Sequence, residues 1–141
     1  MEQKKITPFL WFEKGADEAA RFYAAVFKNS KILSSNPLVT TLELEGQQIM
    51  ILNGGPMYKL NESFSLYVSC DTQEETDYYW EKLTHGGEEG RCGWLKDKYG
   101  VSWQVIPSIL GKLMSDQERS PRIVEAFMKM KKFDIKKLME A

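Results

Sequence analysis

The chain has 141 residues, of which 43% are apolar and 28% are charged, a composition typical of a single folded domain. The 19 basic and 20 acidic residues give a net charge of −1, which argues against nucleic acid as a partner because phosphate binding calls for a basic excess. Apolar runs span only a handful of residues, against roughly 20 for a membrane-crossing helix, so we expect no membrane partner.

Cysteine content and the N-terminal residues predict a cytoplasmic protein. Two cysteines, Cys70 and Cys92, are too few for a disulfide framework, so both thiols are expected to be reduced. The apolar run at residues 6–12 is too short for the core of a signal peptide, and no small-residue cleavage site follows it.

The histidine content excludes several metal sites. His85 is the single histidine of the chain. Any site that needs two imidazoles from one chain is therefore excluded, such as a zinc helix with two histidines or a two-histidine iron site. His85 follows the apolar pattern of a predicted helix, and we expect it to be a surface residue at the end of that helix.

The first half of the chain predicts a strand, a helix and an antiparallel meander. Residues 6–12 are rich in β-favouring side chains, with Pro8 suited to an edge or bulge position. Asp17 is the expected N-cap of a helix whose apolar side chains recur at helical spacing up to Phe27. Strands follow at residues 31–35, 38–45 and 47–53, with a hairpin turn at Glu45-Gly46 and a turn at residues 53–56.

The second half repeats this order. Residues 64–70 alternate as a strand, and Asp71 or Thr72 caps a helix that stops at residues 85–87. Two more strands are expected at residues 91–96 and 101–107, joined by a turn at residues 97–100. An order of elements that occurs twice indicates internal duplication.

These elements predict an α+β fold. We expect two βαβββ modules, residues 5–56 and 63–107, within one domain of residues 1–107. A helical extension at residues 108–141 follows, with a short helix from Ile109 and another whose N-cap is Ser120, followed by Pro121 at its first position. Its apolar side must be buried either on its own domain or on a second subunit.

Four segments carry a more specific pattern: Ile6-Thr-Pro-Phe-Leu-Trp-Phe12 leading into Ala19-Ala-Arg-Phe-Tyr23, Asn53-Gly-Gly-Pro56, Ser65-Leu-Tyr-Val-Ser-Cys70, and Cys92-Gly-Trp94 with Asp97-Lys-Tyr-Gly-Val-Ser-Trp-Gln104. They resemble the vicinal-oxygen-chelate superfamily of glyoxalase I, bleomycin-resistance proteins and extradiol dioxygenases. The closest likeness is to its PhnB-like group, often labelled 3-demethylubiquinone-9 3-methyltransferase. The resemblance implies a cup-shaped mixed sheet and, because members often pair modules across chains, a homodimer.

The resemblance also points to four positions where metal-dependent members hold a divalent cation. The matching residues here are Thr7 or Pro8, Gln48 or Met50, Ser65, and Gln104. None is a histidine or a carboxylate, and a neutral set of this kind binds a dehydrated cation weakly. We therefore predict no metal and no other cofactor. The methyltransferase label is also unsupported, because the chain lacks the Gly-rich loop that holds a cofactor after the first strand of a doubly wound fold.

Alternation along two strands places neutral polar side chains on one face, suited to a small uncharged or amphipathic ligand. The aromatic residues Trp11 and Trp94 are candidate walls of the pocket. Cys92 is a weak candidate nucleophile, since Arg91 or Lys96 would lower its pKa but no histidine base stands nearby in the sequence. The predicted ligand-binding residues are Ser65, Tyr67, Ser69, Trp94, Ser102, Gln104 and Trp11.

Three functions remain open on the sequence. The first is metal-free binding or sequestration of a small molecule in the cup. The second is a glyoxalase-like or dioxygenase-like enzyme that uses an atypical metal site or Cys92, so catalysis itself is left open. The third is an interaction or regulatory protein whose partner surface is the tail at residues 116–141.

Overall fold

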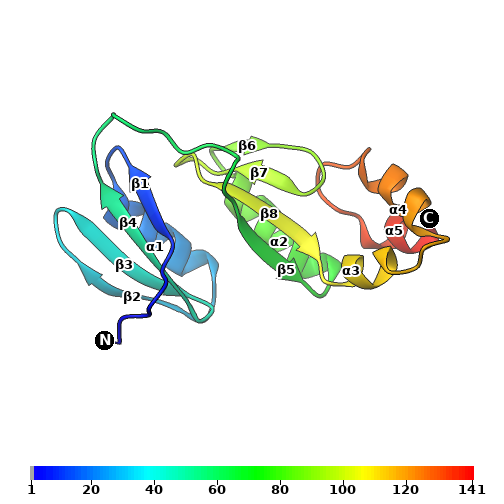
Figure 1. The fold of residues 1–141 in the computed structure, drawn as a ribbon, viewed down its shortest axis with the longest axis horizontal. Helices are drawn as coiled ribbons and strands as arrows, with labels where there is room; N and C mark the ends of the chain where they lie inside the picture. The colour runs from blue at the N-terminus through cyan, green and yellow to red at the C-terminus, as the bar shows by residue number, and fades with distance from the viewer. Residues whose placement is uncertain (1) are drawn as a thin grey trace. The chain divides into compact units, whose positions relative to one another are not determined.

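The computed structural model describes residues 2–141. The chain forms two compact units, one ending at Leu60 and the other running from Asn61 to Ala141 (Figure 1). The boundary falls between the two predicted modules, and the C-terminal helices belong to the second unit. The joining of both modules into a single domain stays a prediction. Within the described residues, no helix combines the length and apolarity needed to cross a membrane.

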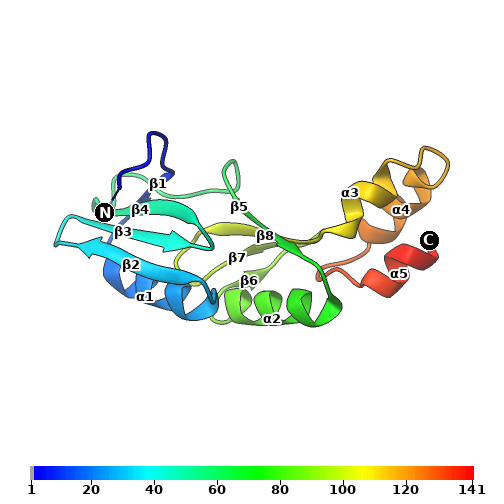
Figure 2. The ribbon, with the colours of Figure 1, turned by 90° about the horizontal axis from the view of Figure 1, so that it is seen from below.

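The first unit is a four-stranded sheet with one helix. Strand β1 runs parallel to β4, while β4, β3 and β2 pair antiparallel, in the order β1-β4-β3-β2. Helix α1 packs along one face of this sheet, as Figure 2 shows, and buries Leu42 and Ile51 beneath it. The elements are β1 (Phe9–Phe12), α1 (Ala16–Val26), β2 (Ser30–Ser35), β3 (Val39–Leu44) and β4 (Gln47–Asn53).

Helix α1 begins differently from the prediction. Asp17 is not its N-cap: Gly15 holds that position, and no side chain of its own caps the helix. Instead, the Ala16 N–H donates to Asn53 Oδ1 at 2.9 Å, so the cap comes from the end of β4. Asp17 lies in the first turn and pairs with Arg21. A residue 37 positions away performs the capping, which no local sequence pattern indicates.

The hairpin at Glu45-Gly46 is confirmed. Both residues have positive φ, 48° and 88°, as the tightest two-residue hairpin turns require. The turn fixes the register of β3 and β4, in which Leu44 lies opposite Gln47. The strand predicted at residues 6–12 is shorter than expected, because β1 starts only at Phe9, after Pro8.

The second unit repeats the architecture. Its sheet has the order β5-β8-β7-β6, with β5 parallel to β8 and the remaining pairs antiparallel. Helix α2 packs on one face and buries Trp80 and Leu83 there. Its N-cap is Thr72, whose hydroxyl accepts the Glu75 N–H at 3.1 Å, so the prediction of a cap at Asp71 or Thr72 is confirmed at Thr72. The elements are β5 (Leu66–Cys70), α2 (Gln73–Thr84), β6 (Glu88–Glu89), β7 (Trp94–Lys96) and β8 (Ser102–Pro107).

The strand predicted at residues 91–96 was wrong in its first half. Cys92 and Gly93 have φ values of 57° and 80°, so the chain turns there and β7 begins only at Trp94. The turn carries the backbone against the C-terminal segment, where the Cys92 N–H donates to Met130 O and the Gly93 N–H to Lys131 O, both at 2.8 Å. Strand β6 was not predicted, because two residues show no alternation that could be detected.

The turn between β7 and β8 is organised by a buried carboxylate. Asp97 accepts backbone N–H groups of Tyr99 and Val101 on one oxygen, at 2.8 and 3.0 Å. Its other oxygen accepts the indole N–H of Trp103 at 2.8 Å. Asp97 therefore shapes the turn, as predicted, and also anchors a core tryptophan of β8.

The C-terminal extension packs on its own unit. Its helices are α3 (Ile109–Met114), α4 (Ser120–Phe127) and α5 (Ile135–Glu140). Ile123, Phe133 and Leu138 are fully buried in a cluster with Ile106 of β8. The apolar side of the extension, which was expected to be buried either on its own domain or on a second subunit, is therefore buried within the chain. Arg119, not Ser120, is the N-cap of α4.

Candidate ligand site

The sheet of the second unit has a polar face opposite α2. Residues directly paired on neighbouring strands share a face, and Gln104 lies between Tyr67 of β5 and Trp94 of β7. On the same face, Ser102 pairs with Lys96. The alternate residues of β8, Trp103 and Val105, face α2 and are buried. The structure therefore brings six predicted residues onto one face: Ser65, Tyr67, Ser69, Trp94, Ser102 and Gln104.

Gln104 is held in place on this face. Its side-chain Nε2 donates to Ser65 Oγ at 2.9 Å, across β8 and the start of β5. Tyr67, directly beside it, is 61% exposed, and partial burial raises the pKa of its phenol, which therefore stays protonated at neutral pH. Ser69, two residues further along β5 on the same face, is exposed. The arrangement offers a ligand several neutral donors and acceptors on a rigid strand pair.

A cavity of about 160 Å³ opens at the β6–β7 edge of this sheet. Lys96 Nζ lies 3.1 Å from Glu62 Oε2 at its rim, and the hydrogen bond and charge of that ammonium lower the pKa of Glu62. Ser102 is 2% exposed, and its Oγ has no hydrogen-bond partner among the residues that the structure describes. The residues that line the cavity include Glu62, Glu88, Glu89, Trp94, Lys96 and Ser102.

Trp11 lies in the first unit, on the face of β1 whose partner on β4 is Leu52. Its indole Nε1 donates to Gly55 O at 2.9 Å, and its ring meets the edge of Tyr58 with centroids 4.9 Å apart. A Cβ on Gly54 would come within 2.4 Å of the Trp11 ring, which explains the glycine at that position. These contacts make Trp11 a structural anchor of the segment after β4. Its part in ligand binding stays a prediction.

Cys92 belongs to a different environment from the polar face. Its Sγ lies 3.7 Å from Met128 Sδ, in the turn that contacts the C-terminal segment. Cys70, at the end of β5, is fully buried, and desolvation raises the pKa of its thiol to about 12. Neither cysteine has a histidine base beside it, since His85 is an exposed C-cap of α2. The candidate nucleophile gains no catalytic partner from the fold.

The donor set at the positions implied for a metal does not suit a divalent cation. Ser65 and Gln104 are hydrogen-bonded to each other. Gln48 is buried, and its amide is engaged with Gln3, the Lys4 N–H and Glu2 O. Across residues 2–141, no group of three or more His, Cys, Asp or Glu side chains could hold a metal ion. Neutral amides and hydroxyls alone do not offset the dehydration of such an ion.

Solved structures place this architecture in a known class. The chain is similar to the PhnB protein from Bacillus cereus, with 35% identity over 73% of this chain and 99% of that one, at a TM-score of 0.66. It is also similar in fold to protein PA1353 from Pseudomonas aeruginosa, with 18% identity, 74% and 98% coverage, and a TM-score of 0.62. The fosfomycin resistance protein FosX from Listeria monocytogenes, solved with Mn(II) and sulfate, matches at 16% identity, 83% and 99% coverage, and a TM-score of 0.58.

Two βαβββ units with these neighbours define a member of the vicinal-oxygen-chelate superfamily, and the predicted fold class is confirmed. A model of the family described as 3-demethylubiquinone-9 3-methyltransferase matches residues 4–106. The chain belongs to this PhnB-like family. No curated protein matches the sequence.

Sequence reasoning missed the charged half of the site. Glu62 precedes the predicted strand, and Glu88 lies on the two-residue strand β6. Lys96 was identified only as a possible neighbour of Cys92. The single available signal was the alternation of Lys96 with Trp94, which places both on one face of β7.

Proposed function

We propose that this PhnB-like protein binds a small organic molecule, without a metal, on the polar face of β5, β8 and β7. One observation carries the proposal: strand pairing places Tyr67 beside Gln104, and the Gln104–Ser65 hydrogen bond adds Ser65 to this row of neutral donors and acceptors and holds it in place. A preorganised polar row with an aromatic neighbour is typical of small-molecule sites.

The chemistry of the row supports binding over catalysis. The Gln104 amide donates one N–H to Ser65, which leaves its second N–H and its carbonyl oxygen for a ligand. Tyr67 and Ser69 add hydroxyls that both donate and accept. A methyltransferase reaction gains no support from the fold, because each sheet is mixed and carries a single crossover helix, unlike the doubly wound sheet of a cofactor-binding methyltransferase.

A homodimer in the cytoplasm completes the proposal. Several large apolar side chains outside the core are exposed, among them Phe9, Tyr58 and Phe64. Exposed aromatic residues are enriched at protein interfaces, so these side chains support pairing with a second copy. Analytical ultracentrifugation of the full chain checks this: a single monomeric species at micromolar concentration contradicts the dimer.

The binding proposal is tested by a fragment screen with ligand-observed NMR on the full chain. A fragment that binds the polar face is expected to lose about five-fold or more in affinity with Gln104→Ala, equal to about 1 kcal/mol for one partly buried hydrogen-bonding side chain. Gln117→Ala, an exposed glutamine of the tail, is the control and leaves affinity unchanged. Fragments that bind equally well to the Gln104 variant would remove this row from the site.

Elemental analysis of untagged protein tests the metal-free part separately. We expect no stoichiometric divalent metal after incubation with zinc, nickel, manganese and iron, because the donors are neutral. Near-stoichiometric metal would overturn this part and make a glyoxalase-like enzyme the leading candidate.

A further inference from the structure

We propose that the cavity at the β6–β7 edge binds the cationic end of a small ligand, a primary ammonium or a guanidinium group. The inference rests on the proposed binding function and specifies the chemical class of the ligand. It follows from three features of the cavity: its charge, an unpaired buried hydroxyl, and an aromatic side chain beside them.

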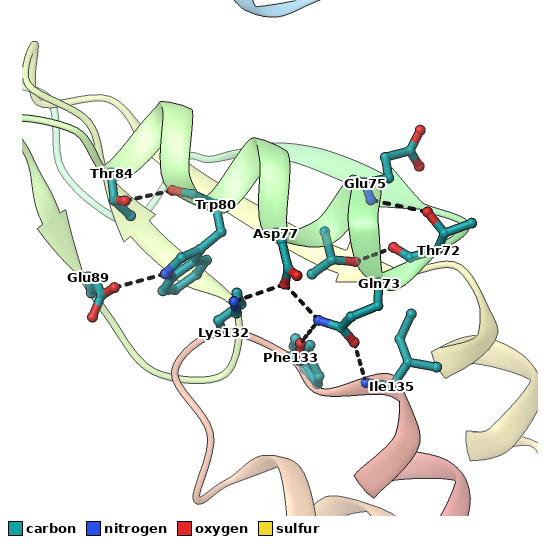
Figure 3. A network of polar contacts seen from close by, with 11 residues as sticks. Thr72, Gln73, Glu75, Asp77, Trp80, Thr84, Glu89, Lys132, Phe133 and Ile135 are labelled. Atoms are coloured by element: carbon teal, nitrogen blue, oxygen red, sulfur yellow. Dashed lines mark hydrogen bonds and ion pairs between the residues drawn. The ribbon is translucent and has the colours of Figure 1, made fainter.

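The first feature is an excess of negative charge. Two carboxylates, those of Glu62 and Glu88, and one ammonium, that of Lys96, lie at the cavity on the polar face of the sheet. Lys96 is already paired with Glu62 at 3.1 Å. Glu89 pairs with Leu95, and its carboxylate accepts the Trp80 indole N–H at 2.9 Å on the α2 side of the sheet, as Figure 3 shows. Glu88 takes part in no ion pair with the described residues, so a cation entering the cavity meets one uncompensated carboxylate.

The second feature is Ser102, which lines the same cavity. Its side chain is almost completely buried on β8, and its Oγ has no hydrogen-bond partner among residues 2–141. A buried hydroxyl without a partner destabilises a fold, and such groups are rare unless something else satisfies them. Serine oxygen carries two acceptor lone pairs, so an N–H of a ligand cation would satisfy it.

The third feature is Trp94, which is half-buried at the cavity wall. An indole face attracts a cation through its quadrupole, and it also packs against the apolar stem of an amine. The volume of about 160 Å³ limits what can enter. A cavity of roughly 150 Å³ accepts a benzene molecule, so this one accepts a group of about five or six non-hydrogen atoms. A four-carbon alkylammonium fits that limit, either alone or as the end of a longer ligand.

An anionic ligand is disfavoured by the same geometry. It would have to displace Glu62 from Lys96 and then lie beside Glu88. A neutral ligand could use Ser102, but it would gain nothing from the unpaired carboxylate of Glu88. Comparing probes of one length and three charges therefore tests the proposal directly.

The experiment is a ¹H–¹⁵N NMR titration of the full chain with n-butylamine, n-butanol and butyrate at pH 7. We expect saturable shifts at the Trp94 indole and the Ser102 amide with butylammonium, and affinity at least ten-fold weaker for the other two probes. Ser102→Ala is expected to weaken butylammonium binding about ten-fold, or about 1.4 kcal/mol. Glu88→Gln is expected to weaken butylammonium binding about three-fold, because the Glu88 carboxylate is exposed to solvent whereas the Ser102 hydroxyl is buried.

Two matched variants serve as controls. Ser108→Ala removes an exposed hydroxyl just after β8, and Glu74→Gln removes an exposed carboxylate from α2, so neither changes the affinity. The proposal is overturned if butanol or butyrate binds as tightly as butylammonium, if butylammonium does not saturate, or if Ser102→Ala has no effect in a variant with a folded spectrum. Failure of all three probes while a fragment still depends on Gln104 overturns the cationic class alone. No ligand in either experiment overturns the binding function as well.

Discussion

Replacing Gln73 with alanine should release the C-terminal segment from α2. This side chain, at the first residue of the helix, makes two hydrogen bonds to the backbone of the tail (Figure 3). Its Nε2 donates to Phe133 O at 2.9 Å, and its Oε1 accepts the Ile135 N–H at 2.8 Å. The same Nε2 also lies 2.9 Å from Asp77 Oδ1, which joins this contact to a neighbouring ion pair.

The structure sets the size of the effect. Each of the two backbone hydrogen bonds is partly buried and is worth roughly 0.5–1.5 kcal/mol net, so Gln73→Ala should cost about 1–3 kcal/mol in docking free energy. The ion pair of Lys132 with Asp77, at 2.8 Å, remains in the variant. Because both of its side chains are well exposed to solvent, this ion pair adds at most about 1 kcal/mol and does not replace what is lost.

Hydrogen exchange at the Ile135 amide measures the docking directly. If docking loses about 1–3 kcal/mol, exchange should accelerate roughly 5- to 150-fold, while amides in the sheet of the first unit keep their rates. Gln73→Glu keeps the acceptor for the Ile135 N–H but loses the donor to Phe133 O and places a second carboxylate beside Asp77, so it should also weaken docking. Gln117→Ala is the exposed control. An unchanged Ile135 exchange rate in Gln73→Ala would show that Gln73 does not hold the C-terminal segment on α2.

Two further predictions concern the turn before β7 and the cysteines. Gly93→Ala should lower the free energy of unfolding, measured by chemical denaturation, by about 2–4 kcal/mol, because φ is 80° and a Cβ would lie 2.7 Å from both Ile106 and Phe133. A loss below about 1 kcal/mol contradicts this prediction. Gly111→Ala, whose Cβ would meet nothing within 4 Å, is the control. Iodoacetamide at pH 8 should modify Cys92 while sparing Cys70, because Cys70 is buried and its pKa of about 12 leaves only about one thiol in 10,000 as thiolate. Equal labelling of both cysteines in denaturant is the control, and equal labelling in the native protein would be inconsistent with the buried environment of Cys70.

Sequence patterns were sufficient to predict the order of the elements in both modules and the residues of the polar face. Periodicity identified β4 at its observed bounds, Gln47–Asn53, and the Glu45-Gly46 turn before it. Alternation placed Ser102 and Gln104 on one side of β8, because a strand sends successive side chains to opposite faces. These features depend on neighbours in the chain, and local physics is sufficient to predict them.

Features that depend on residues far apart in the chain could not be predicted from sequence patterns. Asn53 caps α1 from the end of β4, which made the prediction for Asp17 wrong. Strand β6 exists because β7 supplies its hydrogen bonds, and that pairing brings Glu88 to the cavity edge. The burial of Ser102 without a partner is likewise invisible along the chain, since desolvation is set by everything packed around a group and not by its neighbours in sequence.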